Sequence, residues 1–349
     1  MLPAELLSAP ASAAGSPAQR YAGATILICR PNTRLGNALL MTPLVEEIEA
    51  TLPGARVEIL TACPSAPEVF QEFPSVTRVH QLPFRGFHHP LRHLSTLARV
   101  RRARYDILID PSPRSWTARF LTRHMAAGLK LGFSRAGKAD GVDVSVPFVG
   151  APVHMGDYPV YLLRRGIFGL DDTAARAETP KLTIRLTDAE RLAGQEEIRR
   201  VLGAGAPGPV VAVAAHATGA KQFSVDWWRR MIASLEPHRP APRVIEIRPP
   251  NGVAALSELP AYYSRRVRQV AAVLEAAACF VCADSGLMHL GAATDATTVG
   301  LFKVTDPRLY VPRRGASCAL TASDGAPELV AERVAQLLSR HDFQPGDKQ

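Results

Sequence analysis

The segment from Cys279 to Phe302, CFVCADSGLMHLGAATDATTVGLF, constrains the fold more than any other part of the chain. Cys279 to Ala283 is an apolar run that predicts a buried strand, and Asp284-Ser285-Gly286 predicts a turn. Leu287 to Ala293 then predicts a short apolar helix, and Thr297 to Phe302 predicts a second buried strand. A strand that leads through a polar turn into a helix, and then into another strand, is typical of an α/β fold with a parallel sheet.

The turn between this strand and this helix has the chemistry of an anion site. Ser285 or Asp284 can cap the helix, and Gly286 lets another group approach the backbone closely. The first backbone N–H groups of a helix have no acceptor within the helix, so they can bind a phosphate at the carboxyl end of the sheet. An ordinary capped helix is the plainer alternative, and local chemistry alone does not choose between the two.

Strands and helices alternate along the first half of the chain, as they do in a parallel sheet that is covered on both faces. This half therefore predicts one Rossmann-like domain. The strands are expected at 25–29, 57–61, 76–80, 107–110 and 130–133, and the helices at 38–52, 68–73, 91–104 and 115–126.

A second α/β series begins after the Gly/Ala/Pro-rich break at 203–209. Two helices, at 154–169 and 188–202, precede that break. A chain of 349 residues is long enough to form two domains, each with its own core. In the second series we expect strands at 210–214 and 244–247 before the segment described above, with helices at 227–235, 267–277 and 328–338.

The positive charge of the chain, formally +9, is concentrated between Arg85 and Lys138. Only Asp106 and Asp110 oppose the lysines and arginines of this stretch. Such a face attracts anionic partners, such as a phosphorylated lipid, a membrane surface or a nucleic acid, although a plain solvated surface is the alternative. We find no nucleic-acid-binding motif and few stacking aromatic residues, so nucleic acid is not expected as a partner.

Other features of the composition point to a cytoplasmic protein. No apolar run approaches the roughly 20 residues that span a bilayer, and residues 1–20 lack the pattern of a secretory signal. Five cysteines in this length do not form a disulfide framework, so reduced thiols are expected. The chain has no clustered set of metal-ligating residues, so no metal site is expected.

Four segments of the chain, in order, resemble those of the heptosyltransferases of glycosyltransferase family 9. The family's signature, Asp-[Ser/Thr]-Gly-Leu-x-His-Leu-x-Ala-Ala, resembles residues 284–293, and the resemblance as a whole covers about residues 24–335. The four segments are Arg34 to Pro43, His216 to Trp228 with Thr218 and Lys221, Asp284 to Ala293, and Thr305-Asp306-Pro307.

This resemblance implies a GT-B architecture, in which two Rossmann-like domains face each other across a cleft. The first domain would hold the acceptor, and the second would hold a nucleotide-sugar donor. We then expect a flexible tail at 1–22, the acceptor domain at 23–170, a linker and connecting helix at 171–208, the donor domain at 209–325, a C-terminal helix at 326–340 that can pack back on the first domain, and a disordered tail at 341–349.

The resemblance also implies an activity: metal-independent transfer of heptose, or a related sugar, from ADP-heptose without a further cofactor. The acceptor would be a saccharide or an anionic glycolipid such as the lipopolysaccharide core, and the enzyme would be cytoplasmic or peripheral on the inner face of the plasma membrane. Acceptors of another kind, such as a protein, a capsule precursor or a small molecule, remain open, as does a non-catalytic nucleotide-sugar-binding protein. ADP is taken from the family, because Arg248 to Gly252 holds no acidic residue that could bind the ribose.

Candidate binding residues follow from the matching segments. Lys221 can pair with a phosphate as a mobile point charge, although a solvated surface lysine is the commoner case. His289 can equally pack inside its helix. The donor-binding candidates are Thr218, Lys221, Asp284, Ser285, Gly286, Leu287, Met288 and His289, and the acceptor-binding candidates are Arg34, Gly36, Arg101 and Arg102.

The chain departs from the family where a catalytic base is expected. The family usually carries Gly-Asp in its first loop, whereas this chain has Gly36-Asn37, and an amide cannot accept a proton near neutral pH. The base can be another carboxylate of the first half, of which Asp110, Asp140 and Asp157 are available. Alternatively, Asn37 only orients the acceptor while the leaving diphosphate takes the proton, or the protein has kept binding and lost transfer. Asn37, Asp110 and Asp157 are therefore the catalytic candidates.

Overall fold

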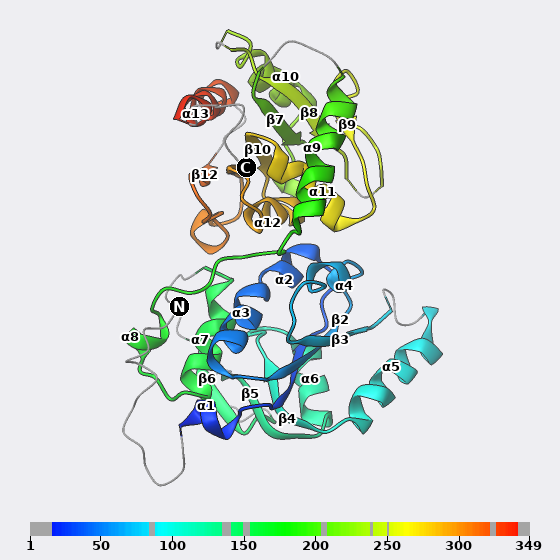
Figure 1. Cartoon of the computed structure of the whole chain (residues 1–349), viewed down its shortest axis with the longest axis vertical. Helices are drawn as coiled ribbons and strands as arrows, with labels where there is room; N and C mark the ends of the chain where they lie inside the picture. The colour runs from blue at the N-terminus through cyan, green and yellow to red at the C-terminus, as the bar shows by residue number, and fades with distance from the viewer. Residues whose placement is uncertain are drawn as a thin grey trace. The chain divides into compact units, whose positions relative to one another are not determined.

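The computed structural model describes residues 16–83, 88–134, 141–148, 154–203, 208–237, 240–249, 251–321 and 326–340. The chain forms two compact units, unit 1 at Met1–Leu182 and unit 2 at Thr183–Gln349. Each unit is built on a six-stranded sheet, and every strand pairing within the two sheets is parallel (Figure 1). The expected fold class, α/β with two Rossmann-like domains, is confirmed.

The sheet of unit 1 has the strand order β3-β2-β1-β4-β5-β6. β1 lies near its centre and is buried over Ile26 to Cys29, as the apolar run predicted. Its parallel neighbours are β2 and β4, so the loops that follow β1 and β4 leave the same edge of the sheet side by side. The strands are β1 (Thr25–Arg30), β2 (Arg56–Thr61), β3 (Val76–Gln81), β4 (Tyr105–Asp110), β5 (Ala127–Ser134) and β6 (Val144–Pro147).

Helices cover both faces of this sheet. α3 packs on α7 on one face, whereas α5 and α6 share an apolar cluster with β1 and β4 on the other. The helices are α1 (Pro17–Arg20), α2 (Leu35–Leu39), α3 (Thr42–Thr51), α4 (Ala66–Val69), α5 (Pro90–Arg102), α6 (Trp116–His124), α7 (Asp157–Gly166) and α8 (Asp172–Ala175).

The helix expected at 38–52 is two helices in the structure. α2 ends at Leu39, and α3 begins at Thr42 with Pro43 in its first turn. A proline has no N–H group and clashes with the preceding turn, so it is tolerated at the start of a helix and not in its interior. Pro43 therefore sets the break that the apolar pattern alone does not show.

A buried ion pair joins α3 to α7. Arg164 donates from Nε to Oε1 of Glu47 at 2.6 Å and from Nη2 to Oε2 at 3.1 Å, and both side chains are almost completely buried. Arg164 also donates to the carbonyl oxygens of Ala177 and Glu178. The guanidinium thus fastens the chain that follows α8 to the core of unit 1.

The sheet of unit 2 has the strand order β12-β11-β10-β7-β8-β9. β10 and β11 are buried along their whole length, as the segment at 279–302 predicted. The short edge strands β9 and β12 lie where the sequence pattern indicated none, because β9 has only two residues and those of β12 are at most partly buried. The strands are β7 (Val210–Ala214), β8 (Arg243–Ile247), β9 (Ala261–Tyr262), β10 (Cys279–Ala283), β11 (Thr298–Phe302) and β12 (Cys318–Thr321).

Helices of unit 2 also lie on both sides of its sheet. α9 packs on α11, and α11 packs on α12, while α10 packs on α13. Trp227 and Trp228 of α10 lie in one apolar core with Val330 and Val334 of α13. The helices are α9 (Asp188–Leu202), α10 (Val225–Ala233), α11 (Val267–Ala276), α12 (Gly286–Ala292) and α13 (Pro327–Arg340), with short 3₁₀ turns at Gly219–Lys221 and Pro307–Leu309.

The domain limits expected from the sequence differ in detail from the two units. The expected connecting segment, 171–208, is divided, because α8 packs on α7 of unit 1 and α9 packs on α11 of unit 2. The C-terminal helix, expected to be able to pack back on the first domain, has its buried side chains in the core of unit 2. The expected C-terminal tail at 341–349 lies wholly outside the described residues, as do residues 1–15 of the expected N-terminal tail. The described part of the N-terminal tail includes the short helix α1.

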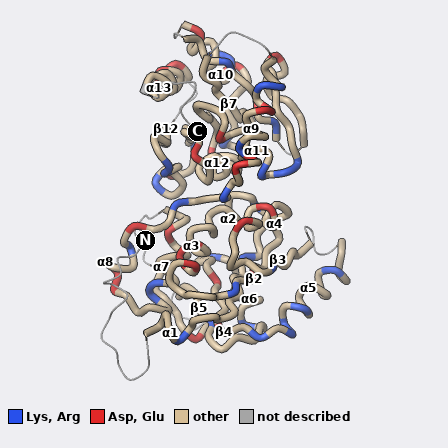
Figure 2. The backbone as a smooth tube through the Cα atoms, viewed as in Figure 1, with Lys and Arg blue, Asp and Glu red and all other residues tan. Residues whose placement is uncertain are grey.

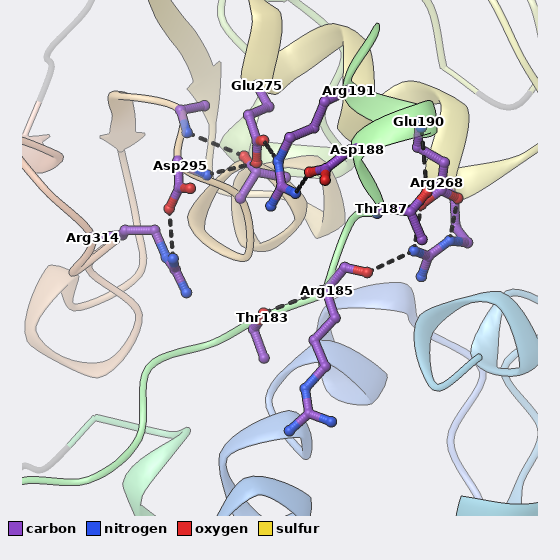
Figure 3. A network of polar contacts seen from close by, with 12 residues as sticks. Thr183, Arg185, Thr187, Asp188, Glu190, Arg191, Arg268, Glu275, Asp295 and Arg314 are labelled. Atoms are coloured by element: carbon purple, nitrogen blue, oxygen red, sulfur yellow. Dashed lines mark hydrogen bonds and ion pairs between the residues drawn. The ribbon is translucent and has the colours of Figure 1, made fainter. Parts of the chain in front are cut away.

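A polar network holds the first residues of unit 2 in place (Figure 3). The guanidinium of Arg268 on α11 donates to the backbone oxygens of Ile184 and Arg185, both at 2.8 Å, and it pairs with Glu190 at the start of α9. Hydrogen bonds from Arg268 lower the pKa of Glu190 to about 2, so this carboxylate stays ionised. Arg185 has a φ of 48°, the left-handed region that a residue with a Cβ seldom adopts.

The five cysteines form no disulfide, as expected. Cys29, Cys63, Cys279 and Cys282 are buried, and Cys318 is half-buried. Burial raises the pKa of all four buried thiols, to about 12 at Cys279. Among the described residues, no helix is both long enough and apolar enough to cross a membrane.

Candidate functional site

The loops that follow β7 and β10 form the first group of candidate residues. These strands are parallel neighbours, so both loops leave the carboxyl edge of the sheet, where α/β proteins bind ligands. Nζ of Lys221 donates to Oδ2 of Asp284 at 2.6 Å, which joins the two loops. The Asp284 side chain is 6% exposed and that of Lys221 is 31% exposed, so the ammonium is the part of the pair that solvent reaches.

The turn at Ser285 is not capped in the way that the sequence suggested. Ser285 is the N-cap of α12, but its side chain makes no capping hydrogen bond, and Asp284 is instead paired with Lys221. The Oγ atom of Ser285 is buried and has no hydrogen-bond partner among the described residues. The turn therefore keeps a hydroxyl and the first backbone N–H groups of α12 without side-chain caps, beside a lysine.

Met288 and His289 lie inside unit 2. Met288 is fully buried, and its Sδ fills the space beside β11 that Gly300 leaves free. The ring of His289 lies edge-on to Tyr310, with ring centroids 5.7 Å apart, and burial lowers its pKa to about 4. His289 is thus neutral at physiological pH and cannot supply a positive charge to a phosphate.

The loop after β7 exposes two of its polar residues. His216 and Thr218 are exposed, and Thr218 precedes the short 3₁₀ turn that carries Lys221. The tryptophans of the same segment, Trp227 and Trp228, are core residues of α10. Of this segment, only the loop residues are placed to meet a ligand.

Asn37 in unit 1 is held by Arg30, the last residue of β1. Nη2 of Arg30 donates to Oδ1 of Asn37 at 2.9 Å, and Nη1 lies 3.4 Å from Oγ of Ser112 in the loop after β4. Because a guanidinium only donates, the amide atom that faces Arg30 must be the oxygen. The Nδ2 amide of Asn37 makes no hydrogen bond within the described part of the chain, so it remains available as a donor.

Asp110, at the end of β4, is completely buried. Its Oδ2 accepts from Nε of Arg119 at 2.9 Å and its Oδ1 accepts from the backbone N–H of Ser112 at 3.0 Å. Burial raises the pKa of Asp110, and the Arg119 guanidinium partly offsets that effect. Both oxygens are engaged and neither reaches solvent, so the geometry suits a brace for the loop at Ser112 rather than a contact with an acceptor.

Asp157, the first residue of α7, is half-buried and accepts a hydrogen bond from Oγ1 of Thr179 at 2.7 Å. It lines a small cavity of about 50 Å³, together with Arg176 and a cluster of aromatic rings. Phe133, Phe148 and Tyr158 meet edge to face in this cluster. Asp157 is therefore more accessible than Asp110.

The remaining acceptor-side candidates lie apart from one another in unit 1. Gly36 is buried in α2 and Arg34 is exposed just before it, whereas Arg101 and Arg102 are exposed at the end of α5. Asp140, the third carboxylate considered, lies outside the described residues. The pairing of Arg30 with Asn37 was not foreseen from the sequence, where the only signal is a charged residue that ends a buried strand.

No group of three or more histidine, cysteine, aspartate or glutamate side chains in the described ranges could hold a metal ion.

Comparison with known proteins gives a direct match at the turn of Asp284. Residues 265–336 match glycosyltransferase family 9 (heptosyltransferase). The matched residues include β10, α12 and β11, so they confirm the resemblance where the signature lies. The segment at Thr305 also falls within the match, whereas those at Arg34 and His216 precede it. A comparison with the curated proteins found no matching sequence.

Solved structures show the same fold over almost the whole chain. A glycosyl transferase family 9 protein from Veillonella parvula has a TM-score of 0.76 at 16% identity, over 93% of this chain and 100% of that one. The Escherichia coli ADP-heptose lipopolysaccharide heptosyltransferase II has a TM-score of 0.70 at 14% identity, over 90% and 99%. The E. coli heptosyltransferase WaaC, solved with ADP-2-deoxy-2-fluoro heptose, has a TM-score of 0.68 at 17% identity, over 90% and 99%. At these identities the likeness establishes a shared GT-B fold.

Proposed function

We propose that this chain is a heptosyltransferase that moves heptose, or a related sugar, from ADP-heptose to a saccharide or glycolipid acceptor such as the lipopolysaccharide core. Unit 2 would bind the donor and unit 1 would bind the acceptor. The enzyme would act in the cytoplasm or at the inner face of the plasma membrane. The observation that carries this proposal is the Lys221–Asp284 pair at a turn that matches glycosyltransferase family 9.

Lys221 would stabilise the diphosphate of the donor. As the bond to the sugar breaks, negative charge develops on the leaving ADP, and a nearby ammonium lowers the free energy of that state. Asp284 holds Lys221 in the turn before a donor arrives, because an ion pair at 2.6 Å limits the lysine to few rotamers. Ser285, Gly286 and Leu287 would add backbone N–H and hydroxyl hydrogen bonds, and Thr218 would contribute from the loop before Lys221.

Asn37 would orient the acceptor hydroxyl through Nδ2, since Arg30 already occupies its oxygen. An amide cannot take the proton of that hydroxyl. The proton would go to the leaving diphosphate, or to Asp157 as the more accessible carboxylate. Asp110 would act indirectly, by fixing the loop at Ser112.

Transfer would not require a divalent metal. In metal-dependent transferases a cation neutralises the diphosphate, and here Lys221 and the helix start would do so. The turn at Asp284 has one carboxylate, which is already paired with Lys221.

Calorimetric titration with ADP and with ADP-heptose tests the donor site. Lys221→Ala removes a charge-assisted hydrogen bond to phosphate, so affinity for ADP should fall by about 1–3 kcal/mol, or roughly 5- to 150-fold. Lys181→Ala is the matched control, because it removes the same charge from an exposed lysine of unit 1. If both variants bind ADP as the unaltered chain does, Lys221 does not belong to a donor site.

Asn37 also favours one alternative, a nucleotide-sugar-binding protein without transferase activity. That protein would bind ADP-heptose with the same dependence on Lys221, yet release no ADP with any acceptor. Measuring ADP release against a panel of lipopolysaccharide-core, protein, capsule and small-molecule acceptors separates the alternatives, and it also identifies the acceptor class.

A further inference from the structure

Unit 1 concentrates its exposed large apolar side chains on two helices. Leu91 and Leu94 of α5 are 80% and 61% exposed, and Trp116 and Phe120 of α6 are 74% and 63% exposed. These are the only large apolar side chains that the described part of unit 1 exposes. In unit 2 the exposed ones are scattered over separate helices and loops, so the clustering on α5 and α6 calls for a physical reason.

The four side chains lie on outward faces of helices that cover the same face of the sheet. Leu91 and Leu94 are three residues apart and Trp116 and Phe120 four apart, so each pair occupies one side of its helix. The opposite sides point inward, because Val100 of α5 packs in one apolar cluster with Leu121 of α6 and Met125, the residue after that helix. Figure 1 shows α5 and α6 on the same side of unit 1. We call this surface the α5–α6 surface.

The α5–α6 surface is also strongly basic. Residues 88–126 hold eight arginines and two aspartates, a net charge of +6, and one of those aspartates is buried with Arg119. Figure 2 shows the basic residues spaced along α5. On α5, Arg101 and Arg102 continue the face of Leu91 and Leu94 into the last turns, and on α6 Arg123 continues the face of Trp116.

Within the described ranges, the arginines of this surface other than Arg119 lack the carboxylate partners that several arginines of unit 2 have. Arg191, Arg229 and Arg230, for example, all form ion pairs with carboxylates of unit 2. In the described ranges, no carboxylate lies within ion-pair distance of the following arginine side chains of unit 1: Arg92, Arg99, Arg101, Arg102, Arg104, Arg114 and Arg123. The positive charge of the α5–α6 surface is therefore not neutralised within the described part of the molecule.

We propose that the α5–α6 surface docks unit 1 on an anionic lipid bilayer. Leucine, phenylalanine and tryptophan side chains partition into the boundary between headgroups and acyl chains, while arginines beside them meet lipid phosphates. A nucleic acid would satisfy the arginines and leave the leucines in water, so the combination of both kinds of side chain favours lipid. The inference deepens the proposed function. It rests on that function in one respect only, because a lipid-borne acceptor would give such docking a purpose.

Flotation of the full chain with lipid vesicles tests the proposal. The vesicles contain phosphatidylcholine alone or phosphatidylcholine with about 30% phosphatidylglycerol, an anionic lipid that gives the surface a negative potential. They contain no glycolipid, so no acceptor is present. We expect binding to the anionic vesicles and little to the neutral ones. High salt should weaken it, since the Debye length shrinks from about 10 Å at 0.1 M to about 3 Å at 1 M.

Two double variants separate the apolar and basic contributions, each with a matched control. Leu91→Ser with Phe120→Ser should lower the partition coefficient at least about tenfold, whereas Leu192→Ser with Leu329→Ser, similarly exposed in unit 2, should leave it unchanged. Arg101→Gln with Arg102→Gln should lower it about 25-fold, as each arginine near an anionic surface contributes about fivefold. Their control is Arg265→Gln with Arg266→Gln, an exposed adjacent pair in unit 2.

The outcomes are distinct. The proposal is overturned if the chain binds neutral and anionic vesicles equally, or if the surface variants and their controls have equal partition coefficients. It is also overturned if the chain binds a duplex oligonucleotide but not vesicles. All exchanged residues are exposed, so thermal unfolding should show that each variant keeps its fold. An ADP titration of the unaltered chain separates this inference from the proposed function. Vesicle binding without ADP binding refutes only the proposed function. ADP binding without vesicle binding refutes only the docking inference.

Discussion

Replacing Asn37 by aspartate tests the proposal that Asn37 contacts the acceptor hydroxyl. The two side chains are nearly isosteric, so the new carboxylate should take the place of the amide. It would then lie about 2.9 Å from Nη2 of Arg30. One carboxylate oxygen would accept from Arg30, and the other would occupy the position of Nδ2, where it could accept the hydroxyl proton.

The neighbouring guanidinium sets the size of the effect. An opposite charge this close lowers the pKa of a carboxyl group by about 1–3 units below its usual value. A base becomes weaker as its pKa falls, so we expect turnover to rise by about 10²-fold, the low end of the range for general base catalysis. The acid limb of kcat should lie below about pH 4, because the carboxylate stays ionised above it.

The assay is release of ADP from ADP-heptose, with a lipopolysaccharide-core acceptor, between pH 4 and 9. The informative control is the double variant Asn37→Asp with Arg30→Gln, which keeps the carboxylate and removes the guanidinium. Its pKa should return to about 4 or above, so an acid limb should appear in the measured range and turnover at neutral pH should rise further.

Unchanged kcat, KM and pH profile in Asn37→Asp would refute the reasoning, because Asn37 could not then contact the acceptor. A fall in turnover would refute it in another way, by showing that the hydrogen bond donated by the amide matters more than a base at this position. Stability serves as the check on folding, since adding a half-buried ion pair should change the free energy of unfolding by less than about 1 kcal/mol.

Three further predictions concern stability and metals. Arg164→Leu leaves Glu47 buried without its cation, so urea unfolding should show that the free energy of unfolding falls by about 3–5 kcal/mol. The control Arg199→Leu breaks an exposed ion pair, so it should lower the free energy of unfolding by less than about 1 kcal/mol. Arg268 lowers the pKa of Glu190 to about 2, so the ionised Glu190 stabilises the fold fully above about pH 4.5, and this contribution is lost as the pH falls from 4.5 toward 2. Glu190→Gln should therefore flatten that part of the acid-unfolding curve. Above pH 4.5 it should lower the free energy of unfolding by up to about 3 kcal/mol. ADP release should persist in EDTA, and a loss of activity that magnesium or manganese restores would contradict metal-independent transfer.

Local sequence signals were sufficient for the buried elements of the fold. The strand at Cys279–Ala283 lies where its apolar run predicted, because burial on both faces of a parallel sheet leaves few polar residues in a strand. The edge strand β12 escaped prediction because it is half-exposed and short. Apolar periodicity also joined α2 to α3, since it takes no account of the missing N–H group of Pro43.

The site was harder to predict than the fold because its contacts join distant parts of the chain. Lys221 and Asp284 are 63 residues apart, and they meet only because β7 and β10 are neighbours in the sheet. The family resemblance brought both to attention, but it could not show that they pair with each other. Arg30 and Ser112 meet because β4 lies beside β1, a strand order that the chain sequence does not state.

The burial of the cysteines makes the protein suitable for labelling at chosen positions. A thiolate is the form that reacts with maleimides and iodoacetamide, and burial keeps Cys29, Cys63, Cys279 and Cys282 protonated and out of contact with reagents. Cys318, half-buried, is the one native thiol that a reagent could reach. Cys318→Ser would therefore provide a silent background on which one cysteine introduced into each unit could carry a fluorophore. The distance between the two dyes would then report whether the spacing of the units changes when ADP-heptose is added.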